Sequence, residues 1–99
     1  MDYQLSTPKE IAGILAERNK NLRLSKKWKR TTLSERSGVS VASLIRFEQT
    51  AQISLNNFLK LLSALGRLDE ALKLLMPPKV RSIEELEDQN IKTHRRGLI

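Results

Sequence analysis

The chain has 99 residues and no cysteine, which excludes disulfides and cysteine-ligated zinc sites. Aromatic residues make up only 4% of it. Proteins that bind single-stranded nucleic acid usually need several exposed rings. Phe47 and Phe58 instead lie at apolar helical spacings, so we expect them in the core. No apolar run approaches the roughly 18 residues of a membrane span, and residues 1–8 have no signal-peptide pattern. We therefore expect a protein of a reducing compartment that does not enter membranes.

Positive charge is what the chain has in excess. It contains 18 lysines and arginines against 11 acidic residues, for a formal net charge of +7. Such a balance favours a polyanionic partner, either nucleic acid or an acidic membrane surface. Because stacking rings are scarce, duplex DNA is favoured over single-stranded nucleic acid. The length suits one domain rather than two.

Apolar residues recur at helical spacings, which predicts an all-α fold with five helices. Thr7 and Glu10 form a capping box around Pro8, so the first helix is expected to begin there. Ser40 and Ser54 are good caps for two later helices. The expected helices run from Pro8 to about Ser25, from about Arg30 to Ser37, from Val41 to about Gln49, from Leu55 to a stop near Gly66, and from Leu68 to Met76.

The composition changes after Pro78. We expect residues 1–78 to form the folded domain and residues 79–99 to form a short C-terminal tail. Ser82 and Glu85 resemble another capping box, which is compatible with a short helix over residues 82–90.

The segment around Gly38 carries a functional pattern. Ser34 is a small residue where a second helix can cross closely, and Gly38 tolerates the positive φ of a tight turn four positions later. Leu44 and Phe47 lie on one side of the helix that follows Ser40. This combination is typical of a helix-turn-helix, whose second helix reads DNA with its N-terminal residues. The alternative is an ordinary helical hairpin with a glycine turn, but the joint pattern in a basic chain favours DNA binding.

Residues 11–76 resemble the lambda-repressor-like, Xre-type helix-turn-helix domain. The resemblance is carried by Leu22, Arg23, Trp28, Leu33, Gly38, Val39, Ser40, Leu44, Phe47, Glu48, Ser54 and Leu55. It implies a sequence-specific repressor of transcription that binds double-stranded DNA as a homodimer on a palindromic operator. The chain departs from the usual pattern at four places. The family usually has Ser or Thr where this chain has Lys29, Gln where it has Arg30, Ala where it has Ser34, and Gly near Thr50.

In the resembled fold, the first, second and sixth residues of the DNA-reading helix face base edges. These positions are Val41, Ala42 and Arg46. Arg46 can pair with guanine O6 and N7, worth about 1–3 kcal/mol of discrimination, and Val41 and Ala42 can lie against a thymine methyl group. Ser43 is a further candidate for a base or a phosphate contact. For Arg46 the alternatives are a phosphate contact or a solvated charge.

Helix starts attract anions through their free N–H groups and the helix dipole. Polar residues near the expected helix starts, and in the loop before the fourth helix, are therefore candidate phosphate contacts. They are Lys29, Arg30, Thr31, Ser40, Gln49, Thr50, Asn56 and Asn57. Helix capping is part of the role of Ser40. Ser34, Gly38, Leu44 and Phe47 are expected to be structural, and the resemblance implies a structural pair between Arg23 and Glu48.

The Thr7–Pro8 start and the Pro77–Pro78 pair before a short basic tail resemble HipB-like antitoxins, which are encoded beside HipA-type kinase toxins. This resemblance implies an antitoxin that neutralises such a toxin and autoregulates its operon. Alternatives remain open: a protein-interaction module that mainly neutralises a toxin, a stand-alone Xre-type regulator, or a nonspecific architectural or RNA-binding protein. The residues after Pro78 are the candidate contact for a toxin.

Leucines near the end of the domain have two open roles. Leu68, Leu72, Leu74 and Leu75 either form the homodimer contact or close the core.

Nothing in the sequence indicates catalysis. His94 is the only histidine, and no nucleophile–base pairing or Gly-rich phosphate loop is present. The acidic residues from Glu84 to Asp88 are interpreted as a charged helix face, not as a metal cluster. We expect no enzymatic activity, metal, cofactor or small-molecule substrate, and a bacterial, cytoplasmic protein that joins the nucleoid when bound.

Overall fold

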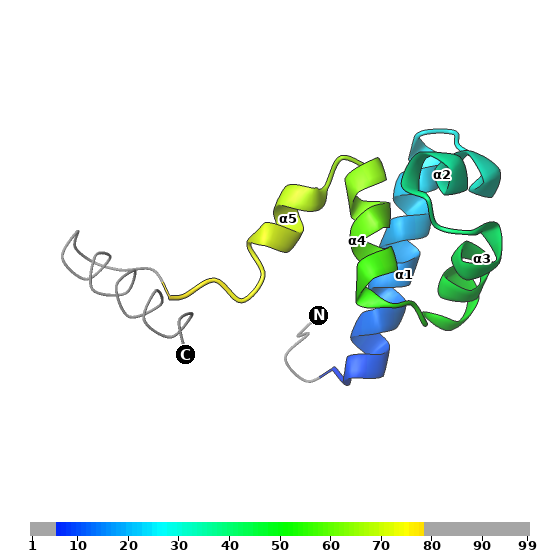
Figure 1. Cartoon of the computed structure of the whole chain (residues 1–99). Coiled ribbons are helices and arrows are strands. Elements are labelled where there is room, and N and C mark those ends of the chain that lie inside the picture. Colours follow the sequence, from blue (N-terminus) through cyan, green and yellow to red (C-terminus); the bar gives the residue numbers. More distant parts are fainter. Residues whose placement is uncertain (1–5, 79–99) are drawn as a thin grey trace.

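The computed structural model describes residues 6–78, which form five helices and no strand (Figure 1). The helices are α1 (Pro8–Ser25), α2 (Arg30–Ser37), α3 (Val41–Thr50), α4 (Leu55–Ala64) and α5 (Leu68–Leu72). The predicted all-α, five-helix fold is confirmed, and α1 and α2 have their expected bounds. The helix considered over residues 82–90 lies outside the described residues.

Side-chain caps fix where three of the helices begin. Thr7, Ser40 and Ser54 each accept a hydrogen bond at 3.1 Å from the backbone N–H three residues later. Each cap satisfies one of the N–H groups that a helix start leaves without an intrahelical partner. Helix α2 begins without such a bond, because the Lys29 side chain at its N-cap has no acceptor.

The hydrophobic core lies where α2 and α3 meet α1 and α4. Its largest fully buried side chains are Leu33, Val39, Leu44, Phe47 and Leu61. The ring of Phe47 in α3 meets that of Phe58 in α4 edge to face, with centroids 5.8 Å apart and planes at 72°, an arrangement that aromatic pairs prefer. The inner side of α3 is therefore anchored in the core.

The turn between α2 and α3 depends on Gly38. Its backbone is left-handed, with φ +80° and ψ 6°, and its N–H donates to the carbonyl oxygen of Ser34 at 2.9 Å. A residue with a Cβ atom loses roughly 1–2 kcal/mol in that conformation. The positive φ predicted at Gly38 is thus confirmed, and it turns the chain so that α3 crosses α2.

The prediction that the fifth helix reaches Met76 was wrong, because α5 ends at Leu72. The chain continues in turns, and Leu75 has a left-handed φ of 59°. Pro77 disfavours the helical conformation at the residue before it. Helix α5 packs mainly against α4 (Figure 1), so side chains beyond Leu72 meet no surface that would stabilise a longer helix.

A buried ion network joins α1, α2 and α3. The Glu48 side chain in α3 is only 2% exposed. Its carboxylate accepts hydrogen bonds from Arg23 Nε at 2.9 Å, Arg23 Nη2 at 3.1 Å and Arg30 Nε at 3.0 Å. Arg23 Nη1 also donates to the carbonyl oxygen of Trp28 at 2.9 Å, which ties in the α1–α2 loop. The network therefore fixes the orientation of α3 relative to the two preceding helices.

The charge of Glu48 is essential to this network. Burial by itself raises the pKa of Glu48, but hydrogen bonds and positive charge from Arg23 and Arg30 outweigh it and leave the pKa below its ordinary value of 4.5. Because the folded-state pKa is the lower one, Glu48 contributes its full stabilisation above about pH 4.5. This contribution is lost as the pH falls through the folded-state pKa.

Replacing Glu48 tests this network. Glu48→Gln keeps the side-chain shape but removes the charge that balances buried Arg23, so we expect the free energy of unfolding at pH 7 to fall by about 3 kcal/mol. Urea unfolding measures the loss, with exposed Glu35→Gln in α2 as the control. The difference from wild type should shrink as the pH falls from about 4.5 through the lower folded-state pKa, where folded Glu48 takes up a proton. Equal stability of the two proteins at pH 7 would contradict this role.

Candidate nucleic-acid interface

Helix α3 has one buried side and one side open to solvent. Leu44 and Phe47 are buried. The four predicted base readers are all exposed or partly exposed: Val41, Ala42, Ser43 and Arg46. The core therefore holds α3 from behind while these side chains stay accessible.

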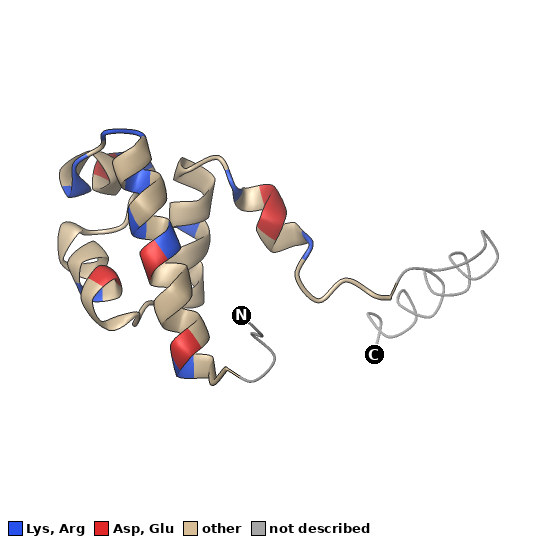
Figure 2. Cartoon of the chain, turned by 180° about the vertical axis from the view of Figure 1, so that it is seen from behind, with Lys and Arg blue, Asp and Glu red and all other residues tan. Residues whose placement is uncertain are grey.

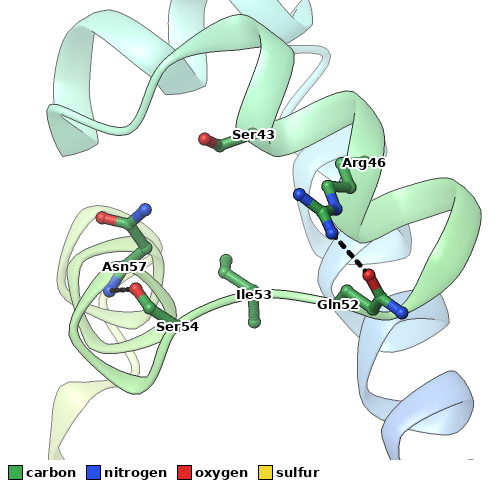
Figure 3. A pocket seen from close by; sticks show the side chains of 6 residues that line it. All are labelled: Ser43, Arg46, Gln52, Ile53, Ser54 and Asn57. Atoms are coloured by element: carbon green, nitrogen blue, oxygen red, sulfur yellow. Dashed lines mark hydrogen bonds between the residues drawn. The ribbon is translucent and has the colours of Figure 1, made fainter.

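A hollow of about 250 Å³ lies beside the open side of α3 (Figure 3). Its lining comes from α3, from the α3–α4 loop and from the start of α4: Ser43, Arg46, Gln52, Ile53, Ser54 and Asn57. Ser43 and Asn57 extend toward it from different helices, and Ile53 on the loop lies between Asn57 and Gln52 in this view. The structure thus brings together three of the predicted DNA contacts, Ser43, Arg46 and Asn57.

The sequence reasoning missed Gln52 and Ile53 at this hollow. They follow Ala51, which takes a left-handed φ of 61° and donates its N–H to the carbonyl oxygen of Phe47 at 2.8 Å. Because Ala51 is not glycine, the sequence carries no clear signal that the chain reverses there. The reversal places Gln52 beside Arg46, whose Nη2 donates to Gln52 Oε1 at 2.8 Å (Figure 3).

The predicted phosphate contacts at the start of α2 do not line this hollow. Lys29 and Thr31 are exposed, and the Arg30 side chain is 37% exposed. The Nε of Arg30 is bound to Glu48, so Arg30 also has a structural role that the sequence reasoning missed. Its other guanidinium nitrogens, with four N–H donors, make no hydrogen bond that involves the described residues.

The remaining predicted phosphate contacts lie at the two ends of α3 and at the start of α4. All are exposed or partly exposed: Ser40, Gln49, Thr50, Asn56 and Asn57. The hydroxyl of Ser40 caps α3 and donates to Ser43 Oγ at 2.9 Å. Capping is therefore part of its role.

The positive charge of the chain resides in its helical part. Residues 6–78 carry 13 of the 18 basic side chains but only six of the 11 acidic ones. Five consecutive residues around the α1–α2 loop include four cations, Lys26, Lys27, Lys29 and Arg30. This loop is the blue stretch in Figure 2. Such a concentration of cations attracts a phosphate backbone and is weakened by salt.

Trp28 lies inside this basic segment. Its ring is partly buried against the core. Lys26 Nζ lies 5.3 Å and Arg36 Cζ 4.6 Å from the ring centroid, both within cation–π range. Trp28 therefore packs against the core and lies beside two cations, which agrees with a structural role.

Residues 6–78 contain no group of three or more His, Cys, Asp or Glu side chains placed to hold a metal ion. No helix in this part of the chain is both long and apolar enough to cross a membrane. His94 and the acidic residues from Glu84 to Asp88 lie outside the described residues.

Residues 20–72 match the helix-turn-helix family, a match that spans more than half of the chain and includes α2, α3 and α4. No curated protein and no solved structure matches the chain significantly. The family match implies DNA binding and the regulation of transcription, and members of this family are typically not enzymes. The chain belongs to the Xre-type, lambda-repressor-like helix-turn-helix family of DNA-binding proteins.

Proposed function

We propose that this protein is a repressor that recognises a specific duplex sequence by placing the open side of α3 in the major groove. The observation that carries the proposal is the position of Arg46, exposed on a helix whose opposite side is fixed by the core and by the Glu48 network. An α-helix fits the major groove, where each base pair presents a distinct pattern of donors and acceptors. Arg46 pairs there with guanine O6 and N7.

The other contacts follow from positions around Arg46. Val41 and Ala42 lie against thymine methyl groups, and Ser43 reaches a base or a phosphate. Phosphates are held by the exposed and partly exposed polar residues near the helix ends: Lys29, Arg30, Thr31, Ser40, Gln49, Asn56 and Asn57. Phosphate contacts set position on the duplex, and base contacts set selectivity.

Replacing Arg46 separates base reading from charge. Arg46→Ala should flatten the preference at one or two base positions, with a loss of about 1–3 kcal/mol of discrimination. Arg46→Lys retains the charge but not the planar fork, so it should recover affinity for random duplex without recovering the full preference. Selection of sites from a randomised duplex library measures both effects. Unchanged selectivity of Arg46→Ala would rule out base reading by this residue.

The protein acts as a homodimer in this proposal. Two α3 helices related by a two-fold axis enter successive major grooves about 34 Å apart on a palindromic operator. The candidate contact is the apolar surface on and after α5, where Leu68 is 41%, Leu72 78%, Leu74 66% and Leu75 101% exposed. These side chains do not belong to the core of the described residues, which supports their role in a subunit contact.

Charged substitutions in this surface test the dimer. Leu72→Asp combined with Leu75→Asp should shift the protein from a dimer toward a monomer of 11.3 kDa in sedimentation equilibrium, because a buried carboxylate opposes association. Leu24→Asp is the matched control, since Leu24 is a 50% exposed leucine on α1. A wild-type protein that is monomeric both free and on its operator would contradict the dimer.

The finer proposal is that the protein is the antitoxin and autoregulator of a HipA-type toxin–antitoxin operon, acting in the bacterial cytoplasm. The support for it is the similarity of Thr7–Pro8 and Pro77–Pro78 to HipB-like antitoxins. The full chain should co-purify with the kinase encoded by the adjoining reading frame. A chain that ends at Pro78 should lose this capture but keep operator binding. Operator binding without capture by the full chain would instead identify a stand-alone regulator.

A further inference from the structure

We infer that Gln52 and Thr50 are positioning residues that hold the Arg46 guanidinium in place before DNA binds, and thereby set its base selectivity. This inference rests on the proposed function, in which Arg46 reads a base. It assigns Gln52 a role that sequence reasoning did not consider. It also gives Thr50 a role other than the predicted phosphate contact.

Three hydrogen bonds form a closed ring among these residues. The Thr50 hydroxyl donates to the backbone carbonyl oxygen of Arg46 at 2.6 Å. The Gln52 backbone N–H donates to Thr50 Oγ1 at 3.3 Å. Arg46 Nη2 then donates to Gln52 Oε1 at 2.8 Å (Figure 3). The left-handed conformation of Ala51 closes the ring, because it turns the chain back toward Arg46.

The ring limits the motion of a side chain that is otherwise free to move. An exposed arginine has high rotamer entropy, which it loses when it is ordered on a base. Arg46 is exposed, and within residues 6–78 its guanidinium has Gln52 as its hydrogen-bond partner. Four of its five N–H donors remain available for a bidentate guanine contact. Ordering before binding reduces the entropic cost of that contact.

The same bonds argue against direct DNA contacts by the two supporting side chains. A bidentate pair between glutamine and adenine needs both the oxygen and the nitrogen of the carboxamide, and Oε1 of Gln52 is already bound to Arg46. A phosphate contact by the Thr50 hydroxyl needs its only proton, which is donated to Arg46. Both side chains therefore act through Arg46.

The test uses the full chain with three substitutions. Gln52→Met removes the acceptor at similar length, Gln52→Glu retains an acceptor, and Thr50→Val removes the hydroxyl at similar volume. The first readout is NMR relaxation of the Arg46 Nε–H in the free protein. The second is a ratio of two affinities. One is for the duplex selected by the wild-type protein from the randomised library, and the other is for the same duplex altered at the base pair where Arg46→Ala loses its preference.

We expect Gln52→Met to make the Arg46 Nε–H more mobile and to lower the affinity ratio by about three- to tenfold, as for the loss of one hydrogen bond of typical net strength. Thr50→Val should act in the same direction with a smaller effect. Affinity of both variants for random duplex should stay unchanged. Gln52→Glu should keep the guanidinium ordered and the ratio close to that of wild type, although its added charge weakens binding to every duplex.

Each contrary outcome identifies what fails. If Gln52→Met keeps the wild-type ratio while Arg46→Ala loses it, the positioning role is wrong and base reading by Arg46 stands. If Gln52→Glu loses preference at a different base pair, Gln52 contacts DNA directly and the positioning role is also wrong. If Arg46→Ala keeps the wild-type preference, base reading by Arg46 fails and this inference fails with it.

Discussion

The orientation of α3 depends on one buried carboxylate. Glu48 lies in α3 with its side chain 2% exposed and receives hydrogen bonds from Arg23 of α1 and Arg30 of α2. Losing the charge on Glu48 would leave buried Arg23 unpaired, and breaking a buried pair from one side is much more costly than losing a surface pair. The network therefore links α1, α2 and α3 through one side chain of α3.

Because its inner side is fixed in this way, the outer side of α3 stays accessible for the DNA contacts of the proposed function. Packing and orientation come from Leu44, Phe47 and Glu48. The core does not include Ala42, Ser43 or Arg46. The cationic α1–α2 loop adds an attraction for phosphate that does not depend on base sequence. In the proposed function, affinity for any duplex and selectivity for bases therefore come from different parts of the same small domain.

Local signals predicted most of the helical part of the fold. The capping residues Thr7, Ser40 and Ser54 and the glycine turn at Gly38 act within a few residues, so they can be read directly from the chain. The α5 boundary could not be read this way, because Leu74 and Leu75 have helical spacing but lack a packing partner. Helix length depends on tertiary contacts as well as on periodicity.

The candidate site was predicted only in part for a related reason. The positions of Ser43 and Arg46 on the open side of α3 follow from helical geometry. The approach of Gln52 follows from the left-handed conformation of Ala51, a residue that gives no turn signal. The second bond partner of Glu48 was equally hidden, because a long Arg30 side chain at a helix start is compatible with either a phosphate or a carboxylate.

In the proposed function, the open side of α3 lies in the major groove of duplex DNA. Methylation interference on the selected operator tests it most directly, because dimethyl sulfate modifies guanine at N7 in the major groove and adenine at N3 in the minor groove. We predict that methylation of guanine N7 in each half-site blocks binding, and that methylation of adenine N3 at the same half-site centres does not. Binding that tolerates every N7 methyl group but is blocked by N3 methylation would instead place the protein in the minor groove.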